Sequence, residues 1–147
     1  LHHFEHLRSR ACILVRSALQ RSFEKSFGQV EQQLREGAGE GEVDTQVFYT
    51  RFRAAAPNYR PLTSLLRARA EAHETYALTL DELEAFYVHL RIRLISAPVA
   101  SNLQSLLGQD VELSQLAPMT RQASSYVLDI SHFERQCFEA YFEIRQP

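Results

Sequence analysis

Residues 75–94, TYALTLDELEAFYVHLRIRL, decide the fold class of this chain. Their large apolar side chains recur at spacings of three and four, which places them on one face of a helix. These side chains are Tyr76, Leu80, Leu83, Tyr87, Leu90 and Leu94. The stripe favours a continuous helix from about Thr75, although residues 79–82 also have the spacing of a capping box where a helix can start. Pro98 is expected to bend or restart the helix, and Gly108 to end it.

A long helical pattern precedes this stretch, from about His3 to Glu36. Its first stripe is followed by a second one on a shifted face, and this slippage favours packing in a globular bundle over a strict two-stranded coiled coil. The first stripe is Phe4, Leu7, Ala11, Leu14 and Ala18, and the second is Leu19, Phe23, Phe27, Val30 and Leu34.

A flexible loop is predicted over about residues 37–44, because three glycines in five residues disfavour a helix. Asp44 or Thr45 can then cap a second helix. Pro57 lacks an amide hydrogen and disfavours helix in the residue before it, so a break or kink is expected near Ala56. Asn58 can cap a new helix that runs to about His73.

The last helix is predicted to begin near Ser114, with Pro118 in its early turns. Its apolar positions keep a heptad-like rhythm through Leu116, Met119, Ala123, Tyr126, Ile130, Phe133 and Cys137, with Tyr141 one residue late. No segment shows strand alternation bounded by turns. We therefore predict an all-α fold, an antiparallel helical bundle or helical-rod segment spanning 1–147 as one part of a longer chain.

Composition excludes several classes of protein. The formal net charge of the 147 residues is −2, whereas nucleic-acid binders tend to be strongly basic, so no nucleic-acid partner is expected. No apolar run approaches the ~20 residues that cross a bilayer. Cys12 and Cys137 lie within apolar helical patterns, which predicts two buried free thiols.

Patterns typical of catalysis and metal binding are weak. His2 and His6 have a spacing that can hold zinc, but no third ligand accompanies them. His89 and His132 each lie beside an apolar stripe, as packed or rim histidines do. Nucleophile and phosphate-loop motifs do not occur. We expect no enzyme, no metal and no cofactor.

A basic stretch is the one unusual charge feature. Between Thr45 and Ala70 there are five arginines and no acid, namely Arg51, Arg53, Arg60, Arg67 and Arg69. Arg53, Arg60 and Arg67 recur every seven residues and would align if the helix continued past Pro57. We expect Arg51, Arg53, Arg60 and Arg67 to contact an acidic partner or an anionic lipid. The alternative is a solvated basic face neutralised by acids from neighbouring helices.

Residues 47–57, VFYTRFRAAAP, are more distinctive than helical patterning requires. A Tyr, a basic residue, Phe-Arg and Ala-Ala-Ala-Pro in this order closely resemble a segment of the family of subunit 3 of the conserved oligomeric Golgi complex. The similarity continues in character along nearly the whole chain. It includes Phe4, residues 9–11 and 14–16, Arg60, residues 62–69 and 76–87, Arg91, Leu94, Pro98, residues 119–121 and 138–142.

The resemblance implies a non-catalytic helical rod that works by holding partners. Such subunits are peripheral on the cytosolic face of the Golgi membrane and act in retrograde vesicle transport within the Golgi. Their partners are sister subunits of the complex, SNARE proteins, Rab GTPases and coat proteins. Two alternatives stay open, a rod from another tethering complex such as exocyst and, more remotely, a helical-bundle enzyme or metalloprotein.

Overall fold

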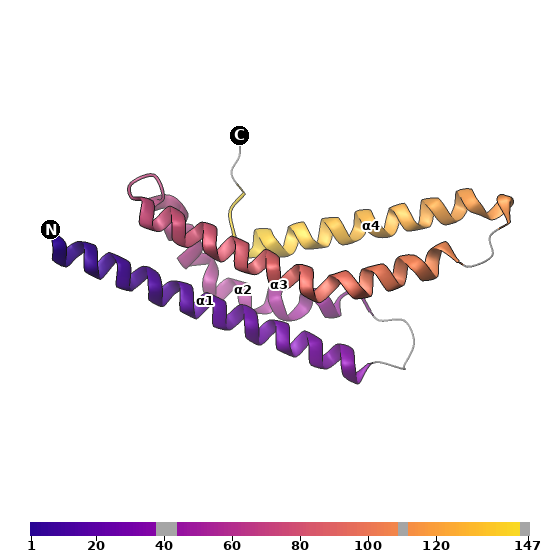
Figure 1. The fold of residues 1–147 in the computed structure, drawn as a ribbon, viewed down its shortest axis with the longest axis horizontal. Helices are drawn as coiled ribbons and strands as arrows, with labels where there is room; N and C mark the ends of the chain where they lie inside the picture. Colours follow the sequence, from indigo (N-terminus) through magenta and orange to yellow (C-terminus); the bar gives the residue numbers. More distant parts are fainter. Residues whose placement is uncertain (38–43, 109–111, 145–147) are drawn as a thin grey trace.

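The computed structural model describes residues 1–37, 44–108 and 112–144, which form four α-helices and no strand. The helices are α1 (His2–Glu36), α2 (Val47–Arg69), α3 (Glu74–Leu107) and α4 (Leu113–Tyr141). Each runs antiparallel to the one before it (Figure 1). The predicted all-α bundle is thereby confirmed. Most of the loop predicted at 37–44 lies outside the described residues.

The central pair of the bundle is α2 and α3, which contact each other and both of the remaining helices. Among the described residues, α1 and α4 share no close backbone approach and lie diagonally opposite across this pair. At one end of the molecule, α3 and α4 extend past the other two helices as a two-helix arm (Figure 1). We call this part the α3–α4 arm; it comprises residues 99–107 and 113–123.

The core is built around the predicted stripe of α3. Leu80, Leu83, Tyr87, Leu90 and Leu94 are all buried. Aromatic side chains from the other helices and from the residue after α4 surround Tyr87 at ring-centroid distances of 5.3 to 6.0 Å. They are Phe23, Phe52, Phe138, Tyr141 and Phe142. Aromatic pairs in such tilted and edge-on geometries stabilise a core beyond their area alone.

The two stripes of α1 have different surroundings. Leu19, Phe23 and Val30 of the second stripe are buried against the other helices. Phe4 of the first stripe is 73% exposed, and Leu7 and Leu14 are exposed as well. Cys12 and Cys137 are buried free thiols, as predicted.

Helix α2 corrects the prediction of a break near Ala56. It continues from Val47 to Arg69 with Pro57 and Pro61 inside it, so Asn58 caps no new helix. Both prolines and Arg53 are on the exposed side of the helix. The carbonyls that lose their helical partners, those of Arg53 and Pro57, lie on that side, where water can hydrate them.

The caps of α2 and α3 also differ from expectation. Neither Asp44 nor Thr45 is the N-cap of α2, which is Gln46; the Asp44 carboxylate instead accepts a hydrogen bond of 3.0 Å from the Gln46 amide. His73 does not end α2. Its Nδ1 accepts a hydrogen bond of 3.1 Å from the Thr75 amide and caps α3.

The sequence left two possible starts for α3, one near Thr75 and one at the capping box of residues 79–82, and the structure shows the earlier one. The helix runs continuously from Glu74, so residues 79–82 start no separate helix. It is not restarted at Pro98 but bends along its length (Figure 1). Gly108 follows its last residue with φ 61°, which confirms the predicted stop, because a positive φ favours glycine.

Helix α4 begins at Leu113, one residue before the predicted start. Ile130, Cys137 and Tyr141 of its predicted stripe are buried, but Leu116 is 54% exposed. Leu116 lies in the α3–α4 arm, where α1 and α2 do not reach alongside α4 (Figure 1). An apolar position of a helix becomes buried only where another part of the chain covers it.

A buried ion pair joins α2, α3 and α4. Arg91 is 3% exposed and donates to both carboxylate oxygens of Glu134, with its Nε at 3.0 Å. Its Nη1 donates to the Phe48 carbonyl at 2.6 Å, and its guanidinium lies over the Tyr49 and Phe52 rings. Burial opposes this charge, but the hydrogen bonds and charge of Glu134 outweigh it and raise the pKa of Arg91. The guanidinium therefore stays charged inside the bundle.

Candidate functional site

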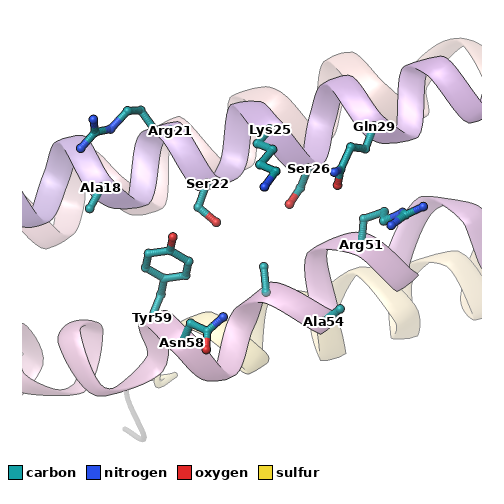
Figure 2. Close-up of a pocket in the computed structure, with 11 residues that line it drawn as sticks. Ala18, Arg21, Ser22, Lys25, Ser26, Gln29, Arg51, Ala54, Asn58 and Tyr59 are labelled. Carbon is teal, nitrogen blue, oxygen red and sulfur yellow. The ribbon is translucent and has the colours of Figure 1, made fainter.

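A basic groove between α1 and α2 is the candidate site (Figure 2). It has a volume of about 500 Å³ and is open to solvent on one side. We call it the α1–α2 groove. It is lined by Ala18, Arg21, Ser22, Lys25, Ser26 and Gln29 of α1 and by Arg51, Ala54, Ala55, Asn58 and Tyr59 of α2.

Hydroxyl groups line the inner part of the groove. Figure 2 shows Ser22 and Ser26 pointing from α1 toward α2, and Tyr59 pointing from α2 toward α1. Both serines are buried and lie one helical turn apart beside the apolar stripe of α1. Ala18, Ala54 and Ala55 have short side chains, which leave the space open between the two helices.

The groove is lined by three cations, Arg21, Lys25 and Arg51, and no acid is among those of its lining residues that the structure describes. None of the three forms a salt bridge with any residue that the structure describes. By contrast, Arg16 on the same helix pairs with Glu82 at 2.5 Å. Arg21 donates only to the Ser17 carbonyl of its own helix, at 3.3 Å. Cations without acidic partners beside a hydroxyl-lined hollow attract anions and offer them hydrogen-bond donors.

The structure separates the four arginines that the sequence grouped. Arg51 lines the α1–α2 groove, and Arg53 is exposed on another side of α2. Arg60 donates to the Glu139 carbonyl and lies 3.7 Å from the Glu143 carboxylate. Arg67 pairs with Glu84 and donates to the Glu143 carbonyl at 3.3 Å. Arg60 and Arg67 therefore join α2 to the end of α4, and only Arg51 and Arg53 are without an ion pair among the described residues.

Arg21 and Lys25 were not singled out from the sequence, and neither were Ser22, Ser26 and Tyr59 of the same groove. Their signal is local, because Arg21 and Lys25 are four residues apart, as are Ser22 and Ser26 beside them. This spacing places both pairs on one polar face next to the buried stripe. It does not show that Arg51 of another helix lies opposite.

His2, His6, His89 and His132 do not gather at a common site. His2 lies 3.8 Å from Glu5 at the exposed start of α1, and His132 contacts Gln136 at 3.0 Å. No group of three metal-ligating side chains occurs among the described residues. Within residues 1–37, 44–108 and 112–144, no helix is both long and apolar enough to span a membrane.

The similarity to known proteins covers the last three helices. The family model described as conserved oligomeric Golgi complex subunit 3, C-terminal, matches residues 45–147, more than two thirds of the chain. The chain belongs to this family. The resemblance stated from residues 47–57 is thus confirmed, since these residues lie within the matched range.

The human conserved oligomeric Golgi complex subunit 3 is 25% identical to this chain over 96 residues. The aligned part is 65% of this chain and 11% of the human protein, so the chain spans about a tenth of that relative's length. No solved structure matches. In this member of the subunit 3 family, the α1–α2 groove combines α1, which precedes the family match, with α2, which lies inside it.

Proposed function

We propose that this chain is a non-catalytic helical scaffold of a Golgi vesicle tether that acts in retrograde transport within the Golgi. The family match over residues 45–147 carries the proposal. It also favours the Golgi complex over the alternative of an exocyst-like rod.

The architecture supports a mechanical role. Four antiparallel helices bury aromatic and aliphatic stripes against one another, which makes a stiff element. The Arg91–Glu134 pair fixes the relative position of three of them from inside. Function then lies on the outer faces, where partners are held.

The proposed partners are the other subunits of the conserved oligomeric Golgi complex, with SNARE proteins, Rab GTPases and coat proteins as further ones. The proposed location is the cytosolic face of the Golgi membrane, reached through the complex as a peripheral protein. Arg51, Arg53, Arg60 and Arg67 contribute to an electrostatic contact with such a partner or with anionic lipid. Arg51 and Arg53 are free to make it directly, whereas Arg60 and Arg67 would have to leave their intramolecular ion pairs.

Affinity capture from a cell extract tests the proposal, with the complete protein as bait. Recovery of the other subunits of the Golgi complex is the expected result. The variant Arg51→Glu/Arg53→Glu should lose one prey while keeping the melting temperature. The matched variant Arg60→Glu/Arg67→Glu should lower the melting temperature, because it places like charges against Glu143 and Glu84.

Two results would contradict the proposal. If the wild-type bait recovers no subunit of the Golgi complex, the scaffold role in that complex is wrong. If Arg51→Glu/Arg53→Glu captures every prey as well as the wild type does, the electrostatic contact is wrong and the scaffold role is unaffected.

A further inference from the structure

We infer that the α1–α2 groove is a binding site for a small, multiply phosphorylated anion, of the kind presented by an inositol phosphate headgroup. The proposed scaffold role does not require this site, and the inference does not rest on that role. Three observations carry it, namely the charge of the rim, the hydroxyl groups of the inner wall and the dimensions of the hollow.

The charge of the rim comes from Arg21, Lys25 and Arg51, which line one hollow with no acid among its described lining residues. The chain as a whole carries a formal net charge of −2, so this groove differs in sign from the molecule around it. Elsewhere on the same helices, Arg16, Arg60 and Arg67 have acidic partners. Lys25 points into the hollow, whereas Arg21 and Arg51 lie at its two ends with their guanidinium groups directed outward (Figure 2). Without acidic partners among the described residues, the three cations give the groove a positive potential, and the two arginine side chains would have to turn inward to contact a bound phosphate.

The inner wall supplies neutral hydrogen-bonding groups beside those cations. Ser26 is 3% exposed, and its hydroxyl points toward α2 with that of Ser22 (Figure 2). Lys25 extends between the two serines toward α2, and the Tyr59 hydroxyl faces them from the other side (Figure 2). Such an arrangement of hydroxyls and cations fits a ligand that carries both phosphates and ring hydroxyls.

The size of the hollow favours a small ligand over a helix of an acidic protein. Its volume of about 500 Å³ lies within the ordinary range for small-molecule sites. The lining positions of α1 run from Ala18 to Gln29, a length of roughly 16 Å at the rise of a helix. A headgroup can reach the buried serines, whereas an α-helix about 10 Å wide would remain on the rim and leave them uncontacted.

The test measures binding to the purified chain without other proteins, so that its failure is independent of the capture experiment. Soluble inositol hexakisphosphate is titrated by calorimetry. Flotation is measured with phosphatidylcholine vesicles that contain phosphatidylinositol phosphate, and with vesicles matched in charge by phosphatidylserine. If the soluble compound binds as tightly as the phosphoinositide vesicles do, the ligand is a free phosphate compound. If the vesicles bind much more tightly than the soluble compound, the ligand is a lipid headgroup.

Matched variants distinguish the groove from general surface charge. Arg21→Gln/Lys25→Gln/Arg51→Gln should weaken binding by about 10- to 100-fold, because each cation near an anionic surface contributes about tenfold or less. The control Arg10→Gln/Arg69→Gln/Arg121→Gln removes the same charge from exposed positions outside the groove and should change binding by less than about twofold. Tyr59→Phe leaves the charge unchanged and should weaken binding by about fivefold.

Unchanged circular dichroism melting of the groove variants shows that a loss of binding is not a loss of fold. The inference is overturned if neither the soluble compound nor the phosphoinositide vesicles bind. It is also overturned if phosphatidylserine vesicles bind as well as phosphoinositide vesicles do, or if the control variant loses as much as the groove variant. Binding of an acidic peptide in preference to the phosphate compounds would likewise overturn it.

Discussion

Arg91 shows how a single residue holds three helices in register. Its guanidinium extends from α3 to Glu134 of α4, to the Phe48 carbonyl of α2 and over two aromatic rings. A buried pair of this kind is not in itself strong evidence of added stability, because two charges lose their hydration. Its removal on one side only is harmful, since an uncompensated charge stays buried.

We therefore expect Glu134→Ala to lower the free energy of unfolding by about 3 kcal/mol. The double variant Arg91→Met/Glu134→Leu should lose less than this single variant, because it leaves no unpaired charge. Urea denaturation followed by circular dichroism measures both. A double variant that is less stable than Glu134→Ala would show that the pair contributes more than its charges cost.

Two buried tyrosines provide a matched test of hydrogen bonding. The Tyr141 hydroxyl donates to the Phe52 carbonyl at 2.5 Å. The Tyr87 hydroxyl is buried with no nitrogen or oxygen partner among the described residues, and the Cys137 thiol beside it is only a weak hydrogen-bonding group. Tyr141→Phe should destabilise the chain by about 1 kcal/mol. Tyr87→Phe should leave stability unchanged or raise it, because an unpaired buried polar group is removed. Equal losses in the two denaturation curves would contradict this difference.

Alkaline pH should destabilise the fold through the same side chains. Burial raises the pKa of Tyr49, Tyr87 and Tyr141 above the ordinary value of 10.0. In the unfolded chain these hydroxyls ionise as the pH passes 10, while the folded state keeps them neutral. Their stabilising contribution is present below pH 10 and is lost above it, at about 1.4 kcal/mol per pH unit for each group. Tyr87→Phe should reduce the loss of unfolding free energy per pH unit by the contribution of one tyrosine. Denaturation at several pH values above 10 measures this slope, and an unchanged slope would contradict the prediction.

At the scale of the element, α2 shows that a helix can contain prolines on its solvent-facing side. Pro57 and Pro61 each remove a backbone donor, yet the helix continues because the affected carbonyls face water. The same sequence on a buried face would leave those carbonyls without a partner. Exposure of one side thus decides whether a proline ends the helix.

Restoring the missing donor should stabilise α2. We expect Pro57→Ala to raise the free energy of unfolding by about 1 kcal/mol, less than the ~3 kcal/mol that proline costs in a helix interior, because the unfolded chain also gains freedom. The midpoint of urea denaturation measures the gain. A lower midpoint would show that the proline-shaped path of α2 is needed for packing against its neighbours.

At the scale of the whole molecule, the bundle is unevenly packed. The buried residues of α3 end at Leu94 and those of α4 begin at Ile130, so the α3–α4 arm has no fully buried side chain. A hydrogen bond of 2.9 Å between Asn102 and Tyr126 links its two helices near the base. Apolar side chains such as Leu113 and Leu128 remain exposed on this arm and beside it.

Amide hydrogen exchange should therefore be faster in the α3–α4 arm than in the core. Amides of residues 99–107 and 113–123 should exchange at least about tenfold faster than those of residues 80–94, because their protection depends on few tertiary contacts. Mass spectrometry of peptic fragments of the isolated chain measures this. Equal protection in the arm and in the core would contradict the prediction.

The residues by themselves determined the fold class, because helical spacing and breakers act locally. The stripe of residues 76–94, the end of α3 at Gly108 and the start of α4 near Ser114 all follow from such signals. So does the family membership, which the segment at 47–57 indicates. Burial of Cys12 and Cys137 could be predicted in the same way, from apolar positions within helical patterns.

Which polar side chains meet depends on how the helices pack against one another. Arg91 becomes buried because Glu134 lies opposite it, 43 residues away. Arg60 and Arg67 acquire acidic partners, whereas Arg51 joins Arg21 and Lys25 across a groove between two helices. The spacing within one helix specifies a face but not the helix that will cover it. The sequence of one helix also does not specify which of its sides remains in water. That is why it did not predict that α2 continues through Pro57 or that Leu116 is exposed.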